Sequence, residues 1–256
     1  DTSLDAHATN DERLSAIFKA RGIRGCLLPF MIYHDRTPFM HEGVAAVGLG
    51  ECPDQRPMHT VTSDYFKNLT TAVDALLAAG YQRIGFCEHG QSTVLSQGVH
   101  WGSFLWNQQR MPQTVPPLVR LPVTDGKAAF MRWFEEHRPD AILVTFYQAG
   151  QWLHEAGLRV PEDVGLAHLG LTAEVAGWSG VNYEAAAVGS AGVDMLVSHI
   201  LRNDYGVPTV PKLMYIPGRW VQGRTTRPPL APMTEHGSPS RSWDWFDENF
   251  QIGPMT

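Results

Sequence analysis

The residue types that most often act as bases, nucleophiles or metal ligands are present, but not in a recognisable arrangement. The eleven histidines are scattered, and no His-Glu-x-x-His pair occurs. The three cysteines, Cys26, Cys52 and Cys87, lie far apart and lack metal-ligand spacing. A Gly-x-Ser-x-Gly nucleophile turn and a phosphate-binding Gly-x-x-x-x-Gly-Lys are also absent. The sequence therefore predicts a protein that is not an enzyme and that uses no metal or cofactor.

One glycine-rich segment resembles the start of a dinucleotide-binding turn. GLGEC, at residues 48–52, lacks the third glycine of that fingerprint, and Pro53 prevents a helix from following it. This segment does not predict a nucleotide cofactor. A hydrolase of unknown type, assembled from residues distant in the sequence, remains one alternative.

Composition and charge narrow the class of protein. The chain has 256 residues, of which 43% are hydrophobic and 18% charged, with 24 glycines and 18 prolines. This balance favours an α/β protein with many short loops over a helical bundle. A formal net charge of -6 offers no general attraction to a phosphate backbone, so these residues alone are not expected to bind nucleic acid.

The cysteines and the polar start of the sequence bear on location. Cys26 and Cys87 lie within apolar runs, and we interpret them as buried free thiols, which favours a reducing compartment. The segment DTSLDAHATNDE does not resemble a signal peptide, and no apolar stretch approaches the length of a membrane span. The expectation is a cytoplasmic protein that does not contact a membrane.

Short apolar runs alternate with amphipathic helical patterns along most of the chain. Such alternation predicts parallel βαβ winding, and strands that are apolar throughout indicate sheets covered on both faces. Asp64 is expected to cap a helix that runs to about Ala79 and ends at Gly80. The expected strands are 23–30, 44–50, 83–89, 140–146 and a strand within 160–170, and the other expected helices are 11–20, 101–110, 128–137, 148–156 and 185–204.

Five phrases in a fixed order resemble the sensor domain of the LacI/GalR family of bacterial transcriptional regulators, closest to its xylose-regulator-like branch. The resemblance extends from about residue 11 to residue 229, and the phrases are RGIRGCLLP, VTSDYFKNLTTAVDALLAAGYQRIGF, RPDAILV, AGLRVPEDVGLAHLG, and AAAVGSAGVDMLVSHI with PGRWVQGRTTRPP. The resemblance implies an α/β fold of the periplasmic-binding-protein-like type I class. This fold has two lobes, each a parallel sheet flanked by helices, joined by three crossings.

The resemblance also implies domain boundaries. It assigns an N-terminal lobe to residues 1–79 plus 185–212, a C-terminal lobe to residues 80–184 plus 213–230, and a tail to residues 231–256. Two family parts, the DNA-reading helix-turn-helix and the first βαβ unit of the sensor, have no counterpart in these residues. DNA binding is therefore expected of a parent protein through an N-terminal domain outside this sequence.

The resemblance places a small-molecule site between the lobes, where the loops that follow the strands converge. Aromatic rings, amides and carboxylates at such positions suit a sugar or sugar derivative. Two positions depart from the family's sugar-reading pattern, because His100 stands where an Arg is common and Gly170 where an Asp is common. The expected ligand-binding residues are Phe30, Glu88, His89, His100, Trp101, Tyr147, Gln148, Asn182 and Tyr183.

Most other aromatic residues have a structural interpretation. Trp133 and Trp152 have helical spacing and are expected in the core or on a dimer surface, as are Phe104 and Trp106. The resemblance implies a homodimer in which the effector changes the spacing of two DNA-reading heads. A secreted solute-binding protein of the same fold, which would feed a sugar transporter, is the principal alternative to a regulator.

Overall fold

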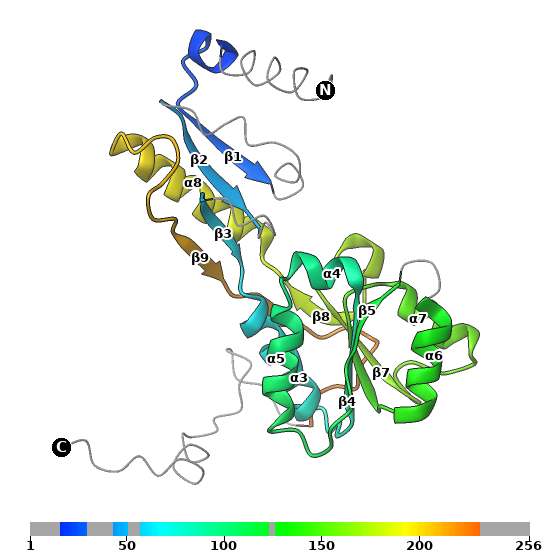
Figure 1. Ribbon diagram of the computed structural model, residues 1–256. Coiled ribbons are helices and arrows are strands. Elements are labelled where there is room, and N and C mark those ends of the chain that lie inside the picture. The colour runs from blue at the N-terminus through cyan, green and yellow to red at the C-terminus, as the bar shows by residue number, and fades with distance from the viewer. Residues whose placement is uncertain (1–15, 30–42, 51–56, 123–125, 231–256) are drawn as a thin grey trace, which may run out of the picture. The chain divides into compact units, whose positions relative to one another are not determined.

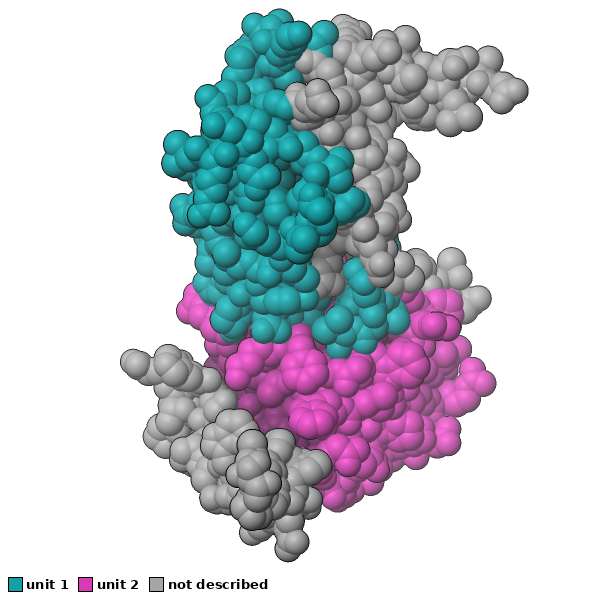
Figure 2. All heavy atoms as spheres, turned by 60° about the vertical axis from the view of Figure 1, so that its left-hand side comes forward, with its two compact units in different colours: residues 1–65, 91–99, 183–218 teal, residues 66–90, 100–182, 219–256 magenta. Residues whose placement is uncertain are grey.

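The computed structural model describes residues 16–29, 43–50, 57–122 and 126–230 (Figure 1). Phe30, Cys52 and the tail at residues 231–256, which were named above, lie outside these residues. The chain divides into two compact units, coloured separately in Figure 2. Unit 1 consists of Asp1–Tyr65, Gln91–Val99 and Tyr183–Gly218, and unit 2 of Phe66–Gly90, His100–Asn182 and Arg219–Thr256.

Unit 1 contains a four-stranded parallel sheet in the order β1-β2-β3-β9. The strands are β1 (Gly25–Pro29), β2 (Ala45–Leu49), β3 (His59–Ser63) and β9 (Leu213–Ile216). Helix α8 (Ala185–Leu201) packs on the first three of them. Close approach is possible because Gly25 faces the Ile200 side chain and Gly192 faces Leu49, where a methyl group would collide.

Unit 2 contains a six-stranded sheet in the order β10-β8-β7-β6-β4-β5, in which only β10 is antiparallel. Its strands are β4 (Ile84–His89), β5 (Leu118–Leu121), β6 (Ala141–Val144), β7 (Gly165–Leu169), β8 (Ser179–Asn182) and β10 (Arg219–Val221). Its helices are α3 (Tyr65–Ala78), α5 (Val99–Gln108), α6 (Gly126–His137), α7 (Gln148–Glu155) and the 3-10 helix η1 (Ala173–Val175).

Helices cover both faces of the unit 2 sheet, as Figure 1 shows. On one face, Phe86 of β4 contacts Phe104 of α5. On the other face, the strands pack against α6 and α7 in a core that includes Phe130, Trp133 and Leu153. This arrangement confirms the predicted α/β class, and it explains why the strands are apolar throughout.

Several local predictions are confirmed. Helix α3 begins directly after Asp64, and Gly80 follows its last turn with φ of +83°. Trp133 and Phe104 are buried, whereas Trp106 is 55% exposed. Cys87 is buried and Cys26 partly so, and both thiols are free. Burial, followed by the charge of Glu88, raises the pKa of the Cys87 thiol well above its usual range, as expected for an inert structural cysteine.

Two short elements of the structure are not among those expected from the sequence. The Gly/Ser/Thr-rich segment after β4 forms helix α4 (Gly90–Leu95). The Pro-rich segment after α5 contains β5, which pairs with β4 at the edge of the sheet. Both elements are short, and neither shows a clear hydrophobic period.

Contacts of α3 and β9 explain how the chain divides into the two units. Helix α3 belongs to unit 2 from Phe66 onward, because α5 packs against it: Ser103 donates a hydrogen bond to the Phe66 carbonyl, and Asn107 donates one to Thr70. Strand β9 belongs to unit 1, because it pairs in parallel with β3. The two units alternate along the chain, with divisions after residues 65, 90, 99, 182 and 218.

None of the helices in the described part of the chain has both the length and the apolar character of a membrane span.

Candidate functional site

The order of the strands in unit 2 creates a switch point beside β4. From β4 the chain continues to β5 at the sheet edge and then returns to β6 on the other side of β4. The helices that make these connections, α5 and α6, lie on opposite faces of the sheet (Figure 1). In open parallel sheets, ligands bind in the crevice at the carboxyl ends of the strands on either side of such a switch. The carboxyl ends of β4 and β6 are therefore the expected position of a ligand-binding site.

Glu88 is the penultimate residue of β4 and is fully buried. The pairing of β4 with β5 shifts register between Cys87 and His89, next to Arg120, which adopts φ of +61°. Irregularities of this kind are common beside functional sites, because they redirect a side chain at the end of a strand.

His100, in the first turn of α5, forms a close pair with Glu88. Its Nδ1 lies 2.7 Å from Oε1 of Glu88, and the His100 residue is only 5% exposed. The other carboxylate oxygen, Oε2, is buried and has no hydrogen-bond partner among the described residues. A buried acceptor that is left unsatisfied is costly and rare in folded proteins, so Glu88 Oε2 marks a place where a further donor is expected.

Trp101 follows His100 in α5 and is partly buried. Its indole Nε1 is buried and, within the part of the chain that the structure describes, has no acceptor. The first turn of α5 and the end of β4 thus carry one unsatisfied donor and one unsatisfied acceptor.

The loop after β6 supplies the other side of the switch point. The backbone N–H of His89 donates to the Thr145 hydroxyl at 3.4 Å, and the His89 ring meets Phe146 edge-on. Tyr147, directly before α7, is 50% exposed, and Gln148 begins that helix. The two strand ends are therefore held together by contacts between their own loops.

Of the nine predicted ligand residues, eight lie in the described part of the chain, seven of them in unit 2 and Tyr183 in unit 1. Within unit 2 the structure brings Glu88 and His100 into contact, with Trp101 following in the same helix. Asn182 ends β8, and it is the register partner of Arg219. Tyr183 belongs to unit 1, where its ring lies 5.5 Å from that of Tyr65.

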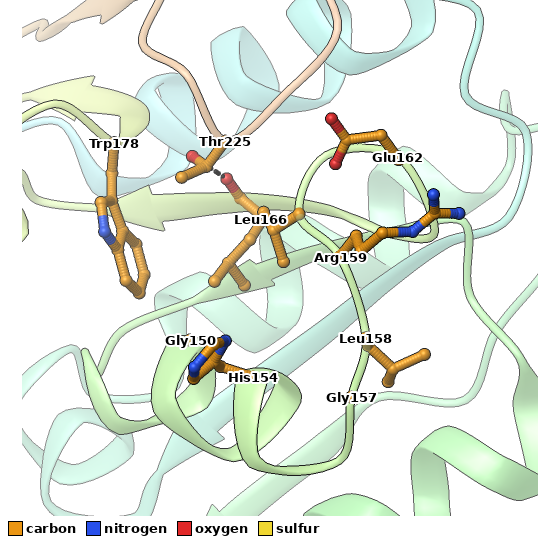
Figure 3. A pocket seen from close by; sticks show the side chains of 10 residues that line it. Gly150, His154, Gly157, Leu158, Arg159, Glu162, Leu166, Trp178 and Thr225 are labelled. Atoms are coloured by element: carbon orange, nitrogen blue, oxygen red, sulfur yellow. Dashed lines mark hydrogen bonds between the residues drawn. The ribbon is translucent and has the colours of Figure 1, made fainter.

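A separate pocket of about 510 Å³ lies elsewhere in unit 2 (Figure 3). Its lining includes α7 residues, the segment after α7, Trp178 and Leu166 near the start of β7. Leu166 places it toward the amino end of that strand, away from the carboxyl ends that carry Glu88 and His89. None of the ligand residues expected from the sequence lines it. Its arginine, Arg159, is held by two hydrogen bonds from its guanidinium to Asp163.

A buried histidine in β7 was not singled out by the sequence. His168 is 7% exposed, meets the Trp178 ring edge-on, and has an Nδ1 with no partner in the described residues. Burial lowers the pKa of His168 from 6.5 to about 4, so the ring is neutral near pH 7. In the sequence, His168 lies between Ala167 and Leu169 in an apolar strand, and only that context could have indicated its burial.

His168 predicts a loss of stability on acidification. In the unfolded chain, His168 binds a proton as the pH falls below 6.5, whereas in the folded chain it binds one only near pH 4. The free energy of unfolding therefore falls as the pH decreases from 6.5 to about 4. The shift corresponds to at most about 3 kcal/mol between pH 7 and pH 4. In urea unfolding, His168→Leu is expected to show a shallower pH dependence than the unmodified chain. Parallel curves for the two proteins would contradict the assignment.

Unit 1 contains a cluster of two histidines and one acid. The rings of His59 and His199 stack with centroids 3.9 Å apart, and His199 Nδ1 lies 2.8 Å from an oxygen of Asp204. The three ligand atoms lie within 4.8 Å of one another, as a metal site would require. However, the backbone N–H of Lys212 donates to Nδ1 of His59 at 3.0 Å. Because that lone pair is occupied, the cluster is better explained as a hydrogen-bonded link between α8, β3 and the segment before β9.

Solved structures with the same fold are numerous. A LacI-family regulator from Enterococcus faecium with bound ribose is 15% identical, with a TM-score of 0.57 over 83% of this chain and 82% of that one. A periplasmic binding protein/LacI regulator from Alkaliphilus metalliredigens with D-xylulofuranose is also 15% identical, with a TM-score of 0.57 over 87% and 84%. The lac repressor dimer bound to operator and an anti-inducer is 19% identical, with a TM-score of 0.60 over 83% and 77%.

These structures establish the likeness in fold, whereas the sequence itself establishes the family. No curated protein matched the sequence. The family model described as a periplasmic binding protein-like domain matches residues 73–226, which include the whole switch point with β4, α5 and β6. This match covers more than half of the chain. The chain therefore belongs to the periplasmic binding protein-like domain family.

Proposed function

We propose that the chain is the effector-sensing domain of a LacI-type transcriptional regulator and that its effector is a saccharide. The observation that carries this proposal is the buried Glu88–His100 pair at the switch point of unit 2, with Glu88 Oε2 unsatisfied. A polar pair of this kind, at the carboxyl end of a parallel strand, is the usual construction of a small-molecule site in such a sheet.

The chemistry of the surrounding residues suits a saccharide. His100, Trp101 and the amide side chain of Gln148 supply hydrogen-bonding groups, while Trp101 and Tyr147 supply ring faces for the C–H surfaces of a sugar. The similar structures from Enterococcus faecium and Alkaliphilus metalliredigens are described with ribose and D-xylulofuranose bound. Phe30, Asn182 and Tyr183 complete the proposed set of ligand residues.

The regulatory part of the proposal concerns the parent protein. We assign DNA binding to a separate N-terminal domain and homodimer formation to the sensor, in keeping with the lac repressor dimer and its operator. The saccharide would act by binding one arrangement of the protein better than another, because a ligand shifts a conformational equilibrium only through differential affinity. No catalytic step forms part of this function.

A thermal-unfolding screen tests the proposed ligand class. The panel contains pentoses including D-ribose and D-xylulose, hexoses, cellobiose, and the uronic acids and sugar phosphates that correspond to them. A saccharide present at 100 times its dissociation constant is expected to stabilise the chain by about 2.7 kcal/mol, which raises the unfolding temperature by several degrees. Amino acids and nucleosides at equal concentration serve as controls. A shift with controls alone, or no shift with any saccharide, would refute the saccharide assignment.

A further inference from the structure

In unit 1, the buried side chain of His59, at the start of β3, is bonded to the residue that precedes β9. The backbone N–H of Lys212 donates to Nδ1 of His59 at 3.0 Å, and the Lys212 carbonyl accepts from the N–H of Thr60 at 2.9 Å. An imidazole nitrogen accepts a hydrogen bond only through its lone pair. The contact therefore fixes His59 as a neutral ring that carries its proton on Nε2.

The ring that stacks on His59 has the opposite state at its own Nδ1. The centroids of His59 and His199 lie 3.9 Å apart, with 14° between the ring planes. His199 Nδ1 lies 2.8 Å from Oδ2 of Asp204, and this hydrogen bond holds the pKa of the Asp204 carboxyl below its usual value. Because a carboxylate only accepts, Nδ1 of His199 carries a proton. One ring of the stack thus needs a lone pair at Nδ1, and the other needs a proton there.

A proton added to His59 removes its acceptor. Both ring nitrogens of an imidazolium donate, so no rotation of the protonated ring restores the bond from the Lys212 N–H. Of the charged groups around His59, His199 and Lys212 oppose the added charge and Asp204 favours it, while β2, which pairs with β3 at this position, has no titratable residue. Burial, followed by the charge of His199, lowers the pKa of His59 below its ordinary value of 6.5.

Strand β9 is held to the sheet mainly by hydrogen bonds. It lies at the edge of the unit 1 sheet, where its only neighbour among the described strands is β3. Its residues Leu213, Met214 and Tyr215 are 50%, 41% and 49% exposed in the described part of the chain. Segments with few buried apolar contacts open at a low cost in free energy. The loss of one hydrogen bond at the start of β9 is therefore a large part of what holds this strand.

We infer that the Lys212–His59 hydrogen bond is a pH-sensitive latch, which holds the start of β9 on β3 while His59 is neutral and releases it when His59 is protonated. In the released form His59 binds a proton below pH 6.5, whereas in the latched form it does so only at lower pH. The free energy of opening therefore falls as the pH decreases below 6.5, and the latch is closed at higher pH. The chain continues from β9 into β10 of unit 2, so the latch acts on a segment that connects the two units.

Hydrogen–deuterium exchange of the unmodified chain between about pH 8 and pH 5 tests the latch. After correction for the intrinsic exchange rate, the protection of backbone amides at residues 212–216 is expected to fall by up to about tenfold per pH unit below pH 6.5, because opening takes up one proton. Amides of β2, in the same sheet, should keep their protection. Constant protection of β9 would overturn the inference, as would an equal fall in β2, which would indicate unfolding of the whole sheet.

A matched pair of variants assigns the effect to His59. His59→Asn places an amide oxygen close to the position of Nδ1 and does not titrate, so an acceptor for Lys212 remains at every pH. The protection of β9 in this variant is expected to be independent of pH over the same range. His154→Asn makes the same change at an exposed histidine of α7 and should behave like the unmodified chain. If β9 in His59→Asn still loses protection as the unmodified chain does, His59 is not the latch.

Nitrogen NMR of the His59 ring tests the latch without a substitution, and it decides the matter if His59→Asn does not fold. At pH 8 the expected state has a proton on Nε2 alone, and the titration midpoint is expected below pH 6.5. The amide signal of Lys212 should change with the same midpoint. A proton on Nδ1 at pH 8, or a midpoint of 6.5 or above, would contradict the inference.

Discussion

Replacing Phe130 with alanine is expected to lower the free energy of unfolding of unit 2 by about 3–5 kcal/mol. Phe130 is fully buried in α6, and its ring centroid lies 6.0 Å from Trp133, 6.3 Å from Phe146 and 5.5 Å from Trp152. Removal of the ring leaves a cavity whose aromatic walls cannot all collapse together. The loss therefore includes lost contacts as well as lost burial.

Urea unfolding followed by tryptophan fluorescence measures this effect, because Trp133 and Trp152 both contact Phe130. Phe66→Ala makes the same chemical change at a position in α3 that is 44% exposed, and it should cost less than half as much. Equal losses at the two positions would show that the α6–α7 face is not the core that the structure indicates. Phe146, which contacts Phe130, directly precedes Tyr147 of the proposed site. Phe130→Ala is therefore expected to weaken saccharide binding as well.

A second large effect is expected for Gly223→Ala. A Cβ atom at Gly223 would lie 2.3 Å from the carbonyl carbon of Trp178, 2.4 Å from its oxygen and 2.5 Å from the Gly177 oxygen. These are backbone atoms, and hydrogen bonds fix them: the Gly223 N–H donates to the Ser179 hydroxyl, and the Arg224 N–H donates to the Gly177 carbonyl. The segment cannot move away without breaking these bonds.

We expect Gly223→Ala to cost about 3 kcal/mol or more of unfolding free energy, at the upper end of the range for overpacked sites. Gly102→Ala is the matched control, because a Cβ atom at this position in α5 meets nothing within 4 Å. A helical glycine that becomes alanine in open space should stabilise the chain by roughly 0.5–1 kcal/mol. Differential scanning calorimetry should therefore show a lower unfolding temperature for Gly223→Ala and a higher one for Gly102→Ala, each compared with the unmodified chain. A shift of Gly223→Ala upward would contradict the close backbone contact.

The sequence predicted the α/β class because its signal is repeated and local. Apolar runs such as that of β6 and amphipathic patterns such as that of α3 each bury one recognisable set of residues. Strand β5 was missed because its four residues, LVRL, are only partly buried, unlike the uniformly apolar and buried β6. Helix α4 was missed because six residues are too few to show a helical period. The division of the chain after Tyr65 could not be derived from local patterns, because it depends on hydrogen bonds between α3 and α5 that join residues 37 positions apart.

The candidate site was predictable as a set of positions but not as an arrangement. Glu88 and His100 were named separately, because one ends a strand and the other begins a helix in the family resemblance. Their 2.7 Å contact depends on how α5 returns over β4, and a single sequence does not specify that geometry. The sequence also could not predict that Oε2 of Glu88 lacks a hydrogen bond, because this depends on the positions of all the neighbouring donors. His168 was overlooked because only its position between Ala167 and Leu169 in an apolar run indicates burial, and no motif around it indicates a function.

Hydrogen–deuterium exchange of the chain, with and without the saccharide that gives the largest thermal shift, tests the central claim most directly. The account predicts slower exchange of backbone amides at the end of β4, in the first turn of α5 and in the loop after β6, around Glu88, His100 and Tyr147. Slower exchange confined to the pocket beside Trp178, or unchanged exchange at the switch point despite saturation with ligand, would contradict it.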